Sequence, residues 1–326
     1  MIETVVAVEL PADESLKVKK IRIAPENPNH LANAKRMSIV TGIHGDELEG
    51  QYVCWKLSSI LQQNKDKLRG IVDIYPALNP FGIDSITRGI PAFDLDMNRI
   101  FPGRADGDMV EYLASKIIED VSGSDLCIDI HASNIFLTEV PQMRINELHK
   151  DMLIDFAKIA NIDFIWLHGA STVLESTFAH SLNERKTPTL VVEMGVGMRI
   201  TKEYGDQLLD GIFNLLGELG IYQNDEKIDV KTPIVSHGAN DVCFLNSPIS
   251  GMFIKSINHG TFVLEGQEIG IIVNPLTGDI LATITAPNKG WLFTIREYPV
   301  VSEGSLMGRI LKEEAYINQI SKGATE

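Results

Sequence analysis

Between residues 36 and about 220 the sequence alternates short apolar runs with segments of helical period, and this alternation restricts the fold more than any other feature. Apolar residues recur at helical spacing over 48–62 and 108–121, and again up to Gly220. Strands that alternate with helices of this length need crossover connections, so we predict an α/β fold with a mixed, mostly parallel sheet flanked by helices. The expected strands are 37–43, 70–80, 125–132, 162–168 and 189–195.

Beyond residue 225 the helical period disappears, and short β-type runs alternate with glycine, asparagine and proline. Residues 247–272 align with residues 285–310 as an imperfect repeat. We therefore predict two domains, residues 1–225 and 226–326, the second an all-β sandwich or barrel. The repeat resembles the two halves of a biotinyl/lipoyl-type carrier domain, but the hairpin "NPLTGD" at 274–279 has no lysine to carry a group.

Charge and composition exclude several classes of partner. The chain has 44 acidic against 29 basic residues, a net charge of −15, which repels nucleic acid and anionic lipid surfaces. The N-terminus lacks the pattern of a signal peptide and no long apolar run follows, so we expect a cytoplasmic protein without a membrane partner. Cys54, Cys127 and Cys243 lie in apolar surroundings and are expected to be buried free thiols.

The stretch "GIHGDELEG" at residues 42–50 places a histidine and several acids directly after an expected strand. Asp46 and Glu49 fit a helix start, where Asp46 would cap the helix and acids favour its positive end. That explanation leaves out His44, which lies at the carboxyl end of the strand, where open α/β sheets place ligands. His44 and Glu47, three positions apart, can turn onto one cation.

A catalytic zinc site needs three protein ligands and one open position, so a further ligand must come from elsewhere. His131 is the best candidate, because it lies at the carboxyl end of the expected strand 125–132, just as His44 lies at the end of the strand 37–43. His168, at another strand end, is the alternative. Asp129 would orient His131 or face solvent as a surface carboxylate. His149 and His180 lie in segments expected to be helical and without companion ligands.

Four motifs in one expected α/β domain, spanning residues 42 to 197, now carry a resemblance. They are "GIHGDE", "DLDMNRIFPG", "DIHAS" and "VVEMGVG", in that order. The chain resembles the succinylglutamate desuccinylase/aspartoacylase family, a branch of the zinc carboxypeptidase fold, to which a small β-domain is appended. The resemblance implies one Zn²⁺ per chain, held by His44, Glu47 and His131, that polarises a carbonyl and lowers the pKa of a water.

The same resemblance implies roles for other residues. Glu193 would be the general base and acid, and Arg88 would stabilise the oxyanion. Asn98 and Arg99 would bind a substrate carboxylate. Without the family, Glu193 would be interpreted as a strand-end carboxylate facing solvent or as a helix cap, and Arg99 as the partner of Asp94 or Asp96. The candidates for reading a second substrate charge, neither clearly aligned, are Arg144 and Arg185.

The predicted function is that of a zinc-dependent amidohydrolase, a deacylase that cleaves the amide of an N-acyl amino acid or a similar small amide. A metallocarboxypeptidase that acts on peptide C-termini would use the same ligands and the same base. A catalytically silent small-molecule binding protein with this fold is the alternative outside the enzymes. A homo-oligomer is a family-level expectation.

Overall fold

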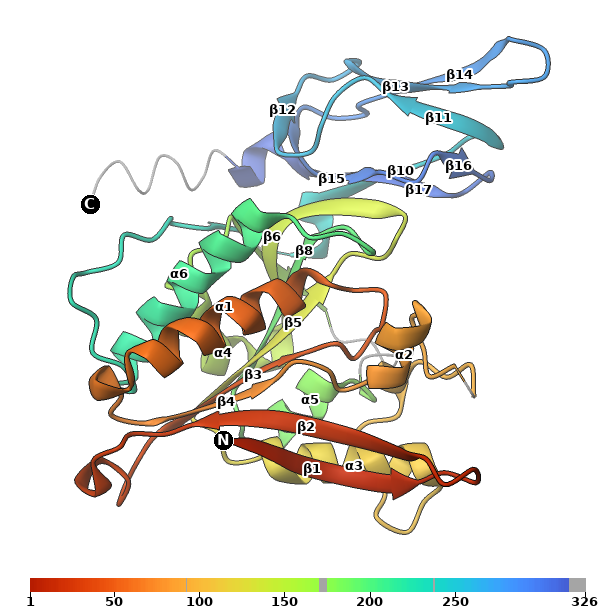
Figure 1. Ribbon diagram of the computed structural model, residues 1–326. Helices are drawn as coiled ribbons and strands as arrows, with labels where there is room; N and C mark the ends of the chain where they lie inside the picture. Colours follow the sequence, from red (N-terminus) through yellow and green to blue (C-terminus); the bar gives the residue numbers. More distant parts are fainter. Residues whose placement is uncertain (92, 170–174, 237, 317–326) are drawn as a thin grey trace.

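The computed structural model describes residues 1–91, 93–169, 175–236 and 238–316 (Figure 1). Its largest element is a thirteen-stranded mixed sheet, whose main path runs β1-β2-β4-β3-β5-β8-β6-β15-β17-β10. The strands of its first part are β1 (Ile2–Glu9), β2 (Ser15–Ile23), β3 (Arg36–Thr41), β4 (Ile71–Tyr75), β5 (Leu126–Ala132), β6 (Leu137–Asn146), β7 (Phe164–His168) and β8 (Thr189–Gly195). The helices are α1 (Glu49–Gln63), α2 (Pro80–Ser85), α3 (Met109–Val121), α4 (Lys150–Lys158), α5 (Phe178–Glu184) and α6 (Lys202–Glu218).

The centre of the sheet is parallel. β3 pairs in parallel with β4 on one side and with β5 on the other, and β5 continues in parallel to β8. Antiparallel strands extend this centre at both edges, with the β1–β2 hairpin beyond β4 and β6 beyond β8. The predicted α/β fold with a mixed sheet is confirmed; β6 is a strand that the sequence did not predict.

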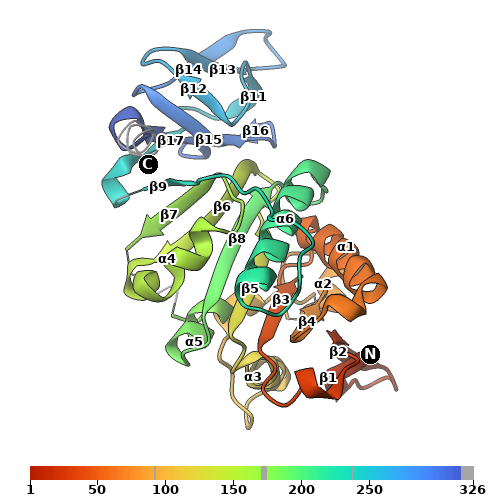
Figure 2. The same ribbon diagram turned by 90° about the vertical axis from the view of Figure 1, so that its left-hand side faces the viewer.

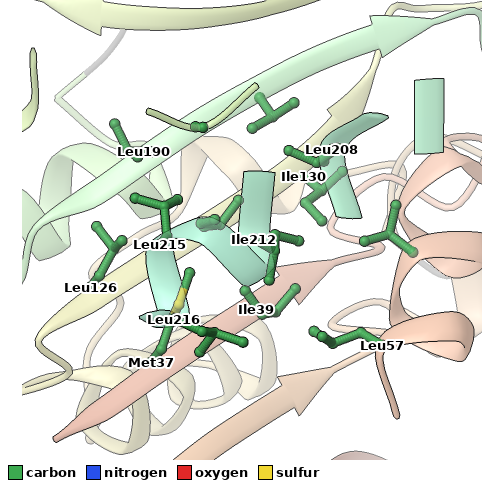
Figure 3. Close-up of a cluster of buried hydrophobic side chains, with 14 of the residues drawn as sticks. Met37, Ile39, Leu57, Leu126, Ile130, Leu190, Leu208, Ile212, Leu215 and Leu216 are labelled. Atoms are coloured by element: carbon green, nitrogen blue, oxygen red, sulfur yellow. The ribbon is translucent and has the colours of Figure 1, made fainter. Parts of the chain in front are cut away.

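Helices α1 and α6 lie side by side over one face of the sheet (Figures 1 and 2). Figure 3 shows how the apolar stripe of α6, with Leu208, Ile212 and Leu216, meets strand residues such as Ile39 and Ile130. All five side chains are buried. Because alternate strand residues point to opposite faces, the residues between them, such as Val40, belong to a second core in which α3 and α5 pack.

After residue 225 the chain runs along α6 to β9, and the strands from β10 onward gather at one end of the molecule, next to β6 (Figures 1 and 2). The strands of this part of the chain are β9 (Ile234–Val235), β10 (Val242–Asn246), β11 (Gly251–Lys255), β12 (Thr261–Val263), β13 (Glu268–Val273), β14 (Ile280–Thr285), β15 (Gly290–Arg296), β16 (Val300–Val301) and β17 (Leu306–Lys312).

The imperfect repeat has a counterpart in the strand pairing. The first copy forms β11, β12 and β13, and the second forms β15, β16 and β17. In each copy the first strand pairs with the third strand of its own copy and with the second strand of the other copy. The two copies therefore exchange their short middle strands, which joins them into one unit.

The division at residues 225 and 226 stays a prediction, because the large sheet runs across it. β6 pairs antiparallel with β15, so that Glu139 lies opposite Thr294. A second contact joins Tyr204 of α6 to His259, with the hydroxyl oxygen 2.6 Å from Nε2. The last ten residues of the expected second domain, 317–326, lie outside the described residues.

Two expectations, on the start of the first helix and on the burial of the cysteines, are wrong. α1 begins at Glu49, and its N-cap residue is Leu48, which makes no side-chain capping bond. Asp46 lies further upstream with a buried carboxylate, so it does not cap the helix, whereas Glu49 does lie in the first turn.

Cys54 and Cys127 are buried free thiols, but Cys243 is only half-buried, because it lies on β10 at the edge of the sheet. Among the described residues, no helix is long and apolar enough to cross a lipid bilayer.

Candidate metal centre and active-site cavity

The loop between β3 and α1 carries His44 and Glu47, and two glycines allow its course. Gly42 has a φ of +70°, in the left-handed region that favours glycine. A Cβ on Gly45 would lie 1.9 Å from the carbonyl carbon of Gly82, so only a glycine lets the loop pack this closely on α2. The Gly45 amide also donates to the carbonyl of Arg88 at 3.2 Å. The loop is thus fixed against a second segment of the site.

His44, Glu47 and His131 converge at the carboxyl ends of β3 and β5. Each is at least 96 % buried. The Nδ1 atoms of His44 and His131 are 3.3 Å apart. One carboxylate oxygen of Glu47 lies 2.7 Å from Nδ1 of His44, and the other lies 2.9 Å from Nδ1 of His131. The three side chains therefore present their donor atoms to one point.

Two aspartates hold the far sides of the imidazoles. Asp96 lies 3.1 Å from Nε2 of His44, and Asp129 lies 3.1 Å from Nε2 of His131. A carboxylate at Nε2 fixes the tautomer that leaves the Nδ1 lone pair free for a cation. Asp129 takes the orienting position suggested by its place two residues before His131, whereas the sequence pointed to Asp96 only as a partner of Arg99.

The electrostatics of the cluster follow from its burial and from its opposite charges. Burial lowers the pKa of His44 and of His131, but the neighbouring carboxylates raise it by more, so both pKa values lie above the ordinary histidine value. Burial raises the pKa of Glu47, but the two imidazoles lower it by more, so this pKa lies below its usual range. Glu47 is accordingly a carboxylate, as a metal ligand must be.

The donor set fits a divalent transition-metal ion. Two imidazole nitrogens and one carboxylate form one of the ligand sets found at catalytic zinc sites. Ligand atoms at about 2.0–2.1 Å from a tetrahedral ion are roughly 3.3 Å apart, which is the separation of the two Nδ1 atoms. His44, Glu47 and His131 would hold such an ion with a fourth position open.

Glu193 lies beside this cluster. The parallel register of β5 and β8 pairs it with His131. Its side chain is 15 % exposed, and Arg144 approaches one of its oxygens at 3.1 Å. Burial raises the pKa of Glu193 above the ordinary glutamate value although Arg144 acts in the opposite direction. A carboxylate with a raised pKa at this position is suited to moving a proton.

A buried carboxylate, Glu139 of β6, joins the site to the C-terminal strands. Its oxygens accept hydrogen bonds from Arg144 at 2.8 Å and from the hydroxyl of Thr294 at 3.1 Å, and Arg309 of β17 forms an ion pair with it. Burial raises the pKa of Glu139, but Arg144 and Arg309 lower it by more. No local sequence pattern marks Glu139 or Arg309 as site residues, because only tertiary pairing, through β15, brings β17 close to β6.

The remaining predicted arginines differ in their surroundings. Arg88 donates to Glu47 at 2.9 Å and lies 3.5 Å from Asp96. Arg99 is exposed, and its guanidinium has no carboxylate within 4 Å among the residues that the structure describes. Arg185 is exposed at the end of α5 and does not line the cavity of the site.

A cavity of about 540 Å³ is lined by the His44 cluster and by most of the other predicted site residues. Asn98, which lines it, is buried and accepts a hydrogen bond from the backbone of Phe178 at 2.9 Å. Eight of the nine predicted site residues line this cavity, namely His44, Glu47, Arg88, Asn98, Arg99, His131, Arg144 and Glu193.

Three further histidines line the same cavity. His168 does not join the His44 cluster, and its Nδ1 lies 3.2 Å from the carbonyl of Gly169. The expectation that His149 and His180 have no companions is wrong, because they lie together with Glu184. Their contact depends on the path of the chain between β6 and α5, which helical spacing alone does not reveal.

The fold and the site define an α/β protein with a two-histidine, one-glutamate cluster at the carboxyl ends of parallel strands. The profile of the succinylglutamate desuccinylase/aspartoacylase catalytic domain matches residues 33–219, more than half of the chain. The chain therefore belongs to this family, as its motifs predicted.

Three proteins are examples of what this chain is similar to. The N-alpha-acetyl-L-2,4-diaminobutyric acid deacetylase of Halomonas elongata is 23% identical over 263 residues, which cover 79% of this chain and 76% of that protein. The product-bound ectoine utilization protein EutE (DoeB) of Ruegeria pomeroyi has a TM-score of 0.80 at 20% identity, with 94% and 93% of the two chains covered. A succinylglutamate desuccinylase of Silicibacter sp. TM1040 also reaches 0.80 at 20% identity, with 95% and 94% covered. These two structures share the fold of this chain.

The contacts of Asp96 and Asp129 generate a test of the cluster. Asp129→Asn and Asp96→Asn should each weaken zinc binding by about 10–100-fold, because an amide orients the imidazole less well than a carboxylate. Competition with a chelating dye measures the affinity. Asp94→Asn, an exposed position in the loop next to Asp96, is the matched control and should bind zinc as the wild type does. Wild-type affinity in both variants would contradict the assigned contacts.

Proposed function

We propose that this protein is a zinc-dependent amidohydrolase that cleaves the amide bond of an N-acyl amino acid or a similar small amide. The observation that carries the proposal is the His44, Glu47 and His131 cluster, which shares its cavity with Glu193. The family supports hydrolysis of an amide, and so does the relative that is a deacetylase. One Zn²⁺ per chain would be bound by the cluster.

Zinc bound there would act as a Lewis acid that polarises the scissile carbonyl and makes a water acidic enough to ionise near neutral pH. Glu193 takes the proton of the attacking water while the water oxygen bonds to the carbonyl carbon. Glu193 then returns the proton to the leaving nitrogen as the C–N bond breaks. The products are an amine and a carboxylic acid, which loses its proton to become a carboxylate near neutral pH, and the glutamate ends as it began.

Two arginines would support this reaction, one at the carbonyl and one at the base. Arg88 is held beside the cluster by Glu47 and would donate to the oxyanion as negative charge develops on it. Arg144 pairs with both Glu139 and Glu193, so we assign it to positioning the base instead of reading a second substrate charge. Arg185, outside the cavity, receives no role in this proposal.

A substrate carboxylate would bind at Asn98 and Arg99. Arg88, Arg144 and Arg309 each face a carboxylate of the protein, whereas Arg99 has none within 4 Å in the described part of the chain. A guanidinium at a cavity that faces no carboxylate of the protein can pair with an anionic ligand through charge-assisted hydrogen bonds. This supports an N-acyl amino acid, which keeps its free α-carboxylate.

The C-terminal region would form a β-sandwich of the biotinyl/lipoyl type that limits access to the site. Arg309 of β17 lines the cavity, which supports a role for this region in shaping it. The hairpin between β13 and β14 has no lysine, so we infer no carrier role. A covered cavity favours small amides over long peptides. A cytoplasmic location remains the expectation.

A substrate screen with the wild type and Glu193→Gln tests the proposal. The wild type should hydrolyse members of a panel of N-acyl amino acids that varies acyl length and side-chain charge. Glu193→Gln should keep its zinc but lose about 10²–10⁴-fold in kcat, because the proton acceptor is gone. Amine release and metal analysis are the measurements.

The other outcomes of this screen are equally informative. Hydrolysis restricted to peptide C-termini would identify a metallocarboxypeptidase. Zinc-loaded protein that binds panel members without turnover would identify a silent binding protein. Wild-type turnover in Glu193→Gln would show that another residue is the base.

Arg99 and Arg185 form a matched pair for the carboxylate site. Arg99→Ala should reduce kcat/KM for N-acyl amino acids by about 10–100-fold, since a charged hydrogen bond contributes about 1.5–3 kcal/mol. The corresponding α-amides, which lack the carboxylate, should show little change. Arg185→Ala should behave as the wild type with both substrate types. An equal loss in both arginine variants would refute the assignment of Arg99.

A further inference from the structure

A second group of two histidines and one glutamate lies at the active-site cavity, away from the His44 cluster. His149 ends a short 3₁₀ turn (Glu147–His149) that follows β6, and it precedes the first residue of α4. His180 and Glu184 lie four positions apart on α5, so both point to the same side of that helix. His149 and His180 line the cavity.

The three side chains are spaced as metal ligands are. A ligand atom of each lies within 4.8 Å of a ligand atom of the other two, as in the His44 cluster. The two imidazole rings have centroids 5.4 Å apart at an interplanar angle of 54°. Nε2 of His149 is 3.5 Å from a carboxylate oxygen of Glu184, longer than the usual range of about 2.7–3.2 Å for an N–H···O hydrogen bond.

Buried polar atoms without partners point to a ligand at this place. His149 is only 8 % exposed, and its Nε2 has no hydrogen-bond partner among the described residues. The buried Nδ1 of His180 likewise has none. A buried nitrogen without a partner costs about 1–3 kcal/mol, so native structures rarely leave one on each of two neighbouring rings. A cation would accept lone pairs from both rings and balance the carboxylate of Glu184.

The position is separate from the first cluster. β6 runs antiparallel to β8, with Gln142 opposite Glu193. His149 follows Asn146, the last residue of β6, which is four residues further along. At about 3.3 Å per residue this end of β6 lies roughly 13 Å from the base. The two groups therefore cannot share one ion.

We propose that His149, His180 and Glu184 bind a second divalent transition-metal ion, such as Zn²⁺. Two imidazoles and a carboxylate suit zinc and its neighbours in the first transition series, and three protein ligands leave one position open. The bound ion would form part of the cavity wall, at the end remote from the hydrolytic cluster.

Metal counting by equilibrium dialysis of the full chain against Zn²⁺ tests this site. The wild type should hold two equivalents, and His149→Ala and His180→Ala should each hold one. The Glu184 side chain is 59 % exposed, so Glu184→Gln should not disturb folding. This variant should weaken binding of the second Zn²⁺ by at least tenfold. His168→Ala is the matched control, since His168 lines the same cavity outside the group, and it should hold two.

The results separate this inference from the proposed hydrolase. His131→Ala should lose the first ion and keep the second. A wild type with one equivalent that His149→Ala retains and His131→Ala loses would overturn the second site and leave the hydrolase intact. A wild type with two equivalents that both survive in Glu184→Gln and His149→Ala would also overturn it. A wild type that binds no zinc would overturn both proposals.

Discussion

The parallel pairing of β3 with β5 is the constraint on which the site depends. Residues 37–41 of β3 pair one for one with residues 126–130 of β5, so the two strands end at the same level. His131 is the next residue of β5, and the turn at Gly42 carries His44 to the same height. The register of β5 with β8 then sets Glu193 beside His131. A slip of one residue in either pairing would turn these side chains to the other face of the sheet.

Charge compensation within a buried site is the second physical theme. Glu47 and Glu139 are almost fully buried, and each faces positive or polar partners on more than one side. Removing one partner from such a group leaves an uncompensated charge, which is more costly than the loss of an exposed ion pair. Because one partner of Glu139 is Arg309 of β17, the C-terminal strands are electrostatically part of the site.

Much of the fold could be predicted from local patterns. The strands that contain Ile39, Ile128 and Val192 are apolar runs, and the stripe of α6 has clear helical spacing. β6 was not predicted, since "LTEVPQMRIN" mixes polar residues with a proline, and its burial comes from the strands on either side and from packing of α4 and α6. The prediction that Asp46 caps the helix is wrong because tertiary packing of the loop, and not capping, decides where α1 begins.

The residues of the candidate site likewise fall into those that local patterns predict and those that depend on tertiary contacts. His44 and His131 could be found because each lies at the carboxyl end of an apolar strand, and Glu47 because it lies three positions after His44. The family motifs added Glu193. Asp96, Arg309 and the His149 group could not, because their roles depend on contacts between segments far apart in the sequence. Residues that act through such contacts have no local spacing to mark them.

Crystallographic anomalous scattering at the zinc absorption edge tests the account most directly. Crystals of the zinc-loaded protein should show a strong peak within about 2.0–2.2 Å of Nδ1 of His44, Nδ1 of His131 and a carboxylate oxygen of Glu47. Absence of that peak, with zinc held by other residues or by none, would contradict the account.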